Sequence, residues 1–250
     1  MGKGVRTHAA PRTAVVWAVL EAELSRRSGQ RLDVVDVGGG TGGFAVPLAR
    51  AGHRVTVVDA SPDALAALER RAAEAGVADQ IRGVQGDADA LTAIVRSNSA
   101  DLVLCHSVLE VVDDPAQVAE AVAAVLRLGG VASVLVSNRV AAVLTRALAG
   151  NLDAAMTLLE DPQGRAGEQD TQLRRFDVAT ASDLLTAAGL RVEQIHGVRV
   201  VADLVPGALL DGEPGSYDAL RRFELAAAAR SPYRDLATQL HLLARNGEPR

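Results

Sequence analysis

The chain contains few cysteine, aromatic and lysine residues, and the first two shortages limit what it can be. Cys105 is the single cysteine, which excludes an intrachain disulfide and a metal site built from several cysteines, so no metal is expected. It lies in an apolar run, where we expect a small buried hydrophobe. Aromatic residues make up only 2% of the 250 residues, so the core has to be built from Ala, Val and Leu. Lys3 is the only lysine among the 26 basic residues.

Long hydrophobic runs are also missing. No stretch approaches the roughly 18 uncharged apolar residues of a membrane-spanning helix, and the N-terminus lacks the apolar core of a signal peptide. We therefore expect a cytoplasmic protein without a membrane contact. The net charge of −5 offers no overall basic field to nucleic acid. Residues 1–32 alone carry a surplus of positive charge, which a solvated terminus and a phosphate-contacting arm explain about equally well.

The most informative stretch runs from Val34 to Phe44. Apolar residues with one acid are followed by a run of glycines and then by a helical pattern, which predicts strand, tight turn and helix. Glycines allow positive φ and close approach of a ligand to the backbone, and the helix start offers free N–H groups. A second apolar strand ends at Asp59, about 20 residues on, where an acid accepts hydrogen bonds from ribose hydroxyls. Together these features predict a cofactor that contains a nucleoside.

Strand and helix patterns alternate five times before residue 138. The expected strands cover 32–37, 54–59, 81–85, 101–106 and 131–136, with helices at 43–51, 62–75, 88–96 and 115–127 between them. A lead-in helix is expected over 12–27. This alternation favours an α/β fold with a doubly wound, mostly parallel sheet, whose ligands lie beyond the carboxyl ends of the strands.

The alternation breaks after Asn138. Residues 139–160 are expected to be helical, 161–171 to form a loop, 180–188 a helix, 190–196 a strand and 217–229 a helix. The segment 238–245 is expected to be a last strand, antiparallel to the fifth, which completes seven strands. We expect one domain over 1–250, with an N-terminal arm and helix at 1–31 and a helical insertion and loop at 139–172.

The glycine spacing separates two kinds of nucleoside cofactor. A dinucleotide site has the pattern Gly-x-Gly-x-x-Gly, whereas this chain has Asp36-x-Gly38-x-Gly40-x-Gly42. That pattern resembles motif I of class I S-adenosylmethionine-dependent methyltransferases, a Rossmann-like family. The resemblance implies that Gly38 and Gly39 face the methionine part of S-adenosyl-L-methionine and that Asp59 faces the ribose.

Over its whole length the chain is similar to the bacterial tRNA 5-carboxymethoxyuridine methyltransferases, which methylate the carboxylate of a modified wobble uridine. The narrowest matching blocks are His106-Ser107-Val108-Leu109-Glu110, Ala149-Gly150-Asn151-Leu152-Asp153 and Gly197-Val198-Arg199-Val200. Carried over by position, the resemblance implies cofactor contacts in and around these motifs. The predicted cofactor-binding residues are Arg12, Asp36, Gly38, Gly39, Gly40, Asp59, Ala60, Asp87, Ala88, Asp89 and His106.

The sequence departs from that family at aromatic positions. Val201-Ala202, Val111 and Ser137 stand where the family has aromatic residues or, at Ala202, a histidine. Aromatic faces stack on extruded bases. The acceptor therefore stays open between a wobble nucleoside of tRNA and a small carboxylate or hydroxyl metabolite. A third interpretation, a nicotinamide-dependent or non-catalytic cofactor-binding protein, is disfavoured by the glycine spacing.

Two residues are predicted to serve the reaction itself. Arg199 is the candidate for holding an anionic acceptor, with Arg174 or Arg175 as alternatives, since guanidinium and carboxylate form paired hydrogen bonds. His106 is predicted to border the cofactor or, for a hydroxyl acceptor, to act as a general base. A carboxylate acceptor is already ionised and needs no base. Glu110 is expected to organise the start of the following helix. The oligomeric state is left open.

Overall fold

Seven strands form one sheet in the order β3-β2-β1-β4-β5-β7-β6, as the computed structural model shows for residues 11–27, 29–167, 170–212 and 215–247. β7 pairs antiparallel with both β5 and β6, and the other neighbours are parallel. The strands are β1 (Asp33–Val37), β2 (Arg54–Asp59), β3 (Ile81–Gln85), β4 (Ala100–His106), β5 (Leu126–Ser137), β6 (Leu190–Val198) and β7 (Gln239–Asn246). The predicted fold class, including the final antiparallel strand, is confirmed.

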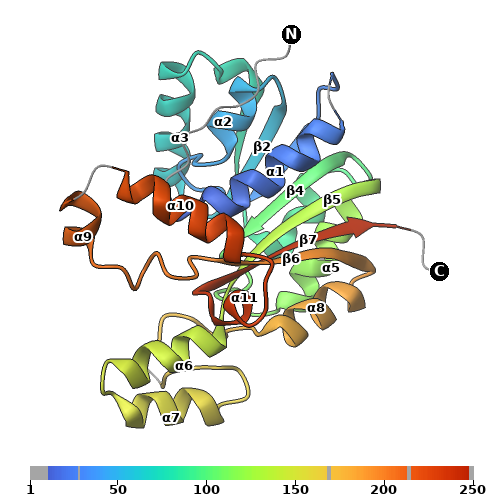
Figure 1. Cartoon of the computed structure of the whole chain (residues 1–250). Coiled ribbons are helices and arrows are strands. Elements are labelled where there is room, and N and C mark those ends of the chain that lie inside the picture. The colour runs from blue at the N-terminus through green and yellow to red at the C-terminus, as the bar shows by residue number, and fades with distance from the viewer. Residues whose placement is uncertain (1–10, 28, 168–169, 213–214, 248–250) are drawn as a thin grey trace.

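Helices cover both faces of the sheet (Figure 1). They are α1 (Ala14–Arg26), α2 (Ala45–Arg50), α3 (Pro62–Glu74), α4 (Leu91–Ile94), α5 (Pro115–Val125), α6 (Arg139–Leu148), α7 (Leu152–Glu160), α8 (Val178–Ala187), α9 (Gly207–Gly212), α10 (Ser216–Ala227) and α11 (Tyr233–Leu236). One apolar cluster joins α1, α2 and α3 to the sheet, and the other joins α5 and α8 to the opposite face. Residues 1–10 of the predicted N-terminal arm lie outside the described residues.

The predicted elements differ from the observed ones mainly around β5 and in the insertion. β5 begins at Leu126 rather than at 131, because a bulge between Ala100 and Leu102 lets the strand pair with β4 earlier. The predicted helix over 139–160 is two helices. Gly150 takes a φ of 78° between them and the side chain of Asn151 caps α7. These two helices project away from the sheet as a hairpin (Figure 1).

The register of the parallel strands brings their carboxyl ends to one edge. Val37, near the end of β1, pairs with Val58 of β2 and Cys105 of β4. The residues that follow these strands are therefore neighbours, as the doubly wound fold requires of a ligand site. Cys105 itself is buried, and burial raises the pKa of its thiol, so it acts as a small hydrophobe as expected.

Asp36 is the acid of β1 and is enclosed by the sheet and the turn above it. Its residue surface is 3% exposed, and Oδ2 has no hydrogen-bond partner among the described residues. An ideal Cβ on Gly39 would lie 2.6 Å from both Cγ and Oδ2 of Asp36, so this carboxyl group lies directly against the turn. Burial, assisted by the negative charge of Asp59, raises the pKa of Asp36 to about 7.

This buried carboxyl predicts a pH-dependent stability. A folded-state pKa raised above the unfolded value means that the native state binds the proton more tightly, so stability falls as pH rises from about 4 to about 7 and then levels off. The full loss has an upper bound of roughly 4 kcal/mol. We expect Asp36→Asn to remove this part of the slope in urea unfolding measured from pH 5 to pH 8. Equal slopes in both proteins would show that Asp36 is ionised in the native state throughout.

Candidate functional site

The turn between β1 and α2 is rich in glycine, so its backbone carries few side chains. Gly38, Gly40 and Gly42 take φ values of 66°, 53° and 81°, a region that residues with a side chain rarely adopt. A Cβ on Gly38 would come within 2.6 Å of Val108 Cγ2. Any larger residue there would push the turn away from the loop after β4, so glycine is what lets these two segments lie together.

Asp59, at the end of β2, is tied to this turn. Oδ2 accepts a hydrogen bond from the Gly40 N–H at 2.8 Å, and Oδ1 accepts one from the Ser61 N–H at 2.9 Å. The carboxylate is thus held in one orientation while remaining partly exposed. Further along, the side chain of Ser61 caps α3 by accepting from the Ala64 N–H. Asp59 and the glycine turn therefore lie together at the carboxyl edge of the sheet.

A cleft of about 560 Å³ opens beside Asp59. The structure brings together six of the predicted residues around it, namely Gly38, Asp59, Ala60, Asp87, Ala88 and Asp89. Asp113 and Asp114 lie on its other side, so five carboxyl groups line one cleft. Such a lining favours cationic or hydroxyl-rich ligands over phosphates. The predicted residues Gly39 and Gly40 belong to the adjoining turn, and Asp36 lies beneath it.

The loop after β4 supplies a part of the cleft in which the sequence analysis assigned no cofactor-binding residue. Ser107, Val108, Val111 and Val112 line it, and Val111 is an exposed apolar side chain. Ser107 takes a φ of 56°, a strained conformation for a residue with a Cβ. A sequence signal was available, because this loop directly follows a buried strand at the carboxyl edge where ligands bind.

Arg12 and Arg199, far apart in the sequence, meet at one carboxylate. Arg12 Nη2 lies 3.1 Å from Asp203 Oδ1, and Arg199 Nε lies 3.3 Å from Asp203 Oδ2. Arg12 is two-thirds exposed, whereas Arg199 is mostly covered. Arg12, predicted to contact the cofactor, and Arg199, predicted to hold an anionic acceptor, therefore converge in space, although neither lines the acidic cleft.

A buried glutamate holds the segment that carries Arg199. Glu224 of α10 is fully buried and accepts hydrogen bonds from the backbone N–H groups of Val200, Val201 and Ala202 at 2.8–2.9 Å. Arg199 itself takes a φ of 59°. Three donors on one carboxylate offset the strain of that turn and fix where the guanidinium projects. Nothing in the helical pattern around Glu224 marked it as different from a surface acid.

His106 is the last residue of β4 but does not line the acidic cleft. Its ring meets Phe44 edge to face at a centroid distance of 4.7 Å, and Phe44 stacks on Trp17. Nε2 of His106 lies 2.9 Å from Ser133 Oγ. Burial lowers the pKa of His106 to about 4, so the imidazole is neutral at neutral pH.

Three further expectations are corrected by the geometry. Glu110 does not organise the start of α5, which Asp114 caps; Glu110 is fully buried and its Oε1 accepts the Ser137 N–H at 2.7 Å. Arg174 donates to the backbone carbonyls of the loop after β4, including Leu109 and Val112. Arg175 is buried in an ion pair with Asp170. These groups build the loop after β4 and its support.

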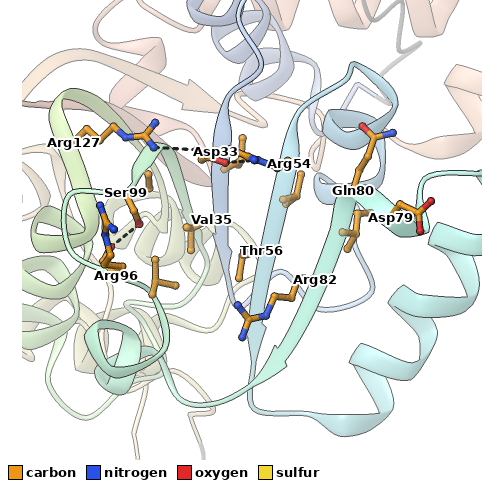
Figure 2. A pocket seen from close by; sticks show the side chains of 15 residues that line it. Asp33, Val35, Arg54, Thr56, Asp79, Gln80, Arg82, Arg96, Ser99 and Arg127 are labelled. Atoms are coloured by element: carbon orange, nitrogen blue, oxygen red, sulfur yellow. Dashed lines mark hydrogen bonds and ion pairs between the residues drawn. The ribbon is translucent and has the colours of Figure 1, made fainter.

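A second cavity lies at the opposite edge of the sheet (Figure 2). It measures about 540 Å³ and is lined by the first residues of β1, β2 and β3, with four arginines, Arg54, Arg82, Arg96 and Arg127, around it. Asp33 neutralises part of this charge, because it pairs with Arg54 at 2.7 Å and with Arg127 at 3.0 Å. The ion pairs brace the amino ends of the strands, far from the glycine turn.

The described residues contain neither a membrane-spanning helix nor a metal-binding cluster of side chains. No helix among them is long and apolar enough to cross a membrane. Within the same part of the chain, no group of three or more His, Cys, Asp or Glu side chains has the arrangement of a metal site.

Comparison with known proteins shows similarity to methyltransferases. A family model described as a methyltransferase domain matches residues 35–134. The tRNA 5-carboxymethoxyuridine methyltransferase of Escherichia coli K12 is 30% identical over 234 residues, which cover 94% of this chain and 87% of that protein. The ubiquinone biosynthesis O-methyltransferase of Xanthomonas axonopodis pv. citri is 32% identical over 165 residues, or 66% and 65% of the two chains.

A solved structure shares the fold. The putative sarcosine dimethylglycine methyltransferase from Galdieria sulphuraria superposes with a TM-score of 0.63 at 18% identity, covering 95% of this chain and 86% of that one. Four observations point to the same family. They are the glycine turn, the acid at the end of β2, the sheet order and the similarity along most of the chain. The chain therefore belongs to the class I S-adenosylmethionine-dependent methyltransferases.

Proposed function

We propose that this enzyme binds S-adenosyl-L-methionine between the glycine turn and Asp59 and methylates an anionic oxygen, the carboxylate of a modified wobble uridine in tRNA. The observation that carries the proposal is similarity at 30% identity to a tRNA 5-carboxymethoxyuridine methyltransferase along 94% of the chain. The geometry adds support from two sides: an acidic cleft suited to the cofactor, and a converging arginine pair suited to an anion.

The residues of the cleft fit the cofactor chemically. Gly38 lines the cleft, so the turn presents backbone without a side chain to a ligand there. The partly exposed carboxylate of Asp59 can accept hydrogen bonds from ribose hydroxyls, and Asp87, Ala88 and Asp89 are available to the adenine edge. Five carboxyl groups around the cleft favour the net positive charge that a sulfonium and an ammonium group give the cofactor.

Arg12 and Arg199 fit the two carboxylates that this reaction brings together. Arg12 would pair with the methionine carboxylate of the cofactor and Arg199 with the carboxylate of the acceptor. Both now pair with Asp203, which shows that each guanidinium can reach a carboxylate at the same spot. The backbone turn fixed by Glu224 orients Arg199 before the acceptor arrives, which lowers the entropy lost on binding.

Methyl transfer to a carboxylate requires no proton transfer by the protein. When bound, the cofactor supplies an electrophilic methyl group on a sulfonium. A carboxylate with an ordinary pKa near 4 is ionised at neutral pH and needs no base. What remains is alignment in a water-poor site, which can contribute roughly 7–11 kcal/mol.

A small-metabolite acceptor is the second candidate, favoured by one specific observation. Val111 at the rim of the cleft is 53% exposed and aliphatic, and Val201, Ala202 and Ser137 likewise offer no aromatic face for stacking on a base. Similarity to the ubiquinone O-methyltransferases over 66% of the chain is compatible with this alternative. The nicotinamide-dependent alternative loses its support, since the family assignment and the glycine spacing both argue against it.

Asp59→Ala is expected to weaken binding of S-adenosylhomocysteine about tenfold to a hundredfold, the value of one or two hydrogen bonds to a charged group. Asp63→Ala on the exposed start of α3 removes the same charge nearby and serves as the control, with affinity within about twofold of wild type. Isothermal titration calorimetry measures both, and circular dichroism checks the fold. Wild-type affinity in Asp59→Ala would count against the ribose contact.

Arg199→Ala is expected to lower kcat/KM for the acceptor at least about a hundredfold while the Kd for S-adenosylhomocysteine stays within about twofold. Arg199→Lys keeps the charge but not the paired hydrogen-bond geometry, so its kcat/KM should lie between those of the wild type and Arg199→Ala. Arg222→Ala, an exposed arginine on α10, is the matched control. A wild-type rate in Arg199→Ala would dismiss this side chain as the acceptor clamp.

The acceptor itself is tested by mass spectrometry of tRNA nucleosides from cells with and without the gene. We expect a methyl ester of a carboxylated wobble uridine only when the gene is present, and in vitro binding to bulk tRNA that weakens steeply as salt rises. Identical nucleoside profiles in the two strains, together with salt-independent behaviour, would overturn the tRNA proposal. Turnover of small carboxylates or phenols in that case would favour the second candidate.

A further inference from the structure

A polar chain of four side chains crosses the carboxyl half of the sheet beneath α1 and α10. Ser133 Oγ of β5 lies 2.9 Å from Nε2 of His106 on β4 and 2.7 Å from Nε2 of His241 on β7. The ring of His196 on β6 stacks on His241 at a centroid distance of 6.0 Å. The strand register places His106 and His241 both beside Leu135, so these side chains share one face of the sheet.

These four polar side chains lie on an otherwise apolar face of the sheet. Ser133 and His241 are fully buried, whereas His196 and His106, the latter at its strand end, keep partial exposure. Burial lowers the pKa of His106 to about 4 and holds the pKa of His241 well below its usual range, with the neighbouring imidazoles adding to the effect on His241. Both rings are neutral at neutral pH, so each carries one proton on one of its two nitrogens.

A single hydroxyl between two Nε2 atoms couples the protons of the two rings. The two Nε2 atoms are the only partners of the buried Ser133 hydroxyl among the described residues, so its own O–H would lack an acceptor if both rings donated to it. Ser133 therefore donates to one Nε2 and accepts from the other, and one ring carries its proton on Nε2 and the other on Nδ1. Nδ1 of both rings is buried without a protein partner among the described residues. Whichever ring is protonated at Nδ1 therefore holds an N–H that only a ligand could satisfy.

The positions of the two rings decide between the two arrangements. His241 is enclosed in the core, where an N–H without a partner is costly and rare, whereas a bare ring nitrogen is better tolerated. Protonation of His241 at Nε2 makes it the donor to Ser133, whose hydroxyl then donates to Nε2 of His106. His106 is left with its proton on Nδ1, at the edge of the sheet where ligands bind.

We propose that Ser133 and His241 are positioning residues that hold His106 as the Nδ1–H tautomer, so that it donates a hydrogen bond to an oxygen of the anionic acceptor instead of acting as a base. This rests on the proposed function and deepens it, because a donor suits a carboxylate acceptor and a base suits a hydroxyl. A neutral donor also spares the cationic sulfonium the repulsion that an imidazolium would cause.

Nitrogen NMR of the histidine side chains tests the tautomer without any turnover. In the wild-type protein at pH 7 we expect a protonated Nδ1 and an unprotonated Nε2 for His106, and the reverse for His241. Ser133→Ala should abolish this pairing, so that His106 shows a mixture of tautomers. An unprotonated Nδ1 on His106 of the wild-type protein would overturn the proposal, whatever the acceptor of the enzyme turns out to be.

Kinetics of the same variants test the consequence. Ser133→Ala and His241→Leu should lower kcat about tenfold with the Kd for S-adenosylhomocysteine within twofold, and His241→Gln, which keeps an amide near the place of Nε2, should recover most of the loss. Val131→Ala removes a buried side chain from the same strand and face and should leave kcat unchanged. Unchanged kcat in Ser133→Ala would overturn the positioning role.

A final pair separates donor from base. His106→Asn keeps an N–H near the place of Nδ1 and cannot act as a base, whereas His106→Leu keeps neither. We expect the asparagine variant to retain at least tenfold more activity than the leucine variant. Equal loss in the two variants would overturn the donor role. Failure of the wild-type enzyme to methylate tRNA would instead count against the proposed function, and the NMR result would still decide the tautomer.

Discussion

The tight contact between the glycine turn and its two neighbours is the constraint on which the site depends. Gly38 and Gly39 have no space for a Cβ, because Val108 lies against the first and the Asp36 carboxyl group against the second. The turn is therefore pressed between β1 and the loop after β4, and its Gly40 N–H donates to Asp59. Without that contact the cleft would lose the glycine backbone that lines it and the Gly40 N–H that orients the Asp59 carboxylate.

Local patterns were sufficient to predict the turn, the acid after β2, the sheet and its antiparallel last strand. Each is signalled by residues close together in the sequence, such as the glycine run beside a buried strand. Polar residues that act through distant contacts could not be predicted this way. Glu224 looks like a surface acid of an amphipathic helix, yet it binds three N–H groups of the Arg199 turn. Ser133 and His241 meet only across β5 and β7.

Charge is sorted across the site. Carboxyl groups line the cleft beside β2 and β3, whereas Arg12 and Arg199 meet on the side of β6, and β4 separates the two regions in the sheet order. A cationic cofactor and an anionic acceptor would approach from opposite sides of such a field. The same acidity means that tRNA phosphates gain nothing at the cleft itself, so affinity for a tRNA has to come from the arginine side.

The neutral histidines complete this arrangement for a physical reason. A positive imidazole at the end of β4 would stand between a sulfonium and two guanidinium groups, and repulsion would then disfavour the cofactor. Desolvation prevents this by holding His106 neutral, while Ser133 keeps the ring from turning. In the proposed arrangement the neutral side chains Ser133 and His241 contribute to the site from inside the sheet, because they decide which nitrogen of His106 carries the proton.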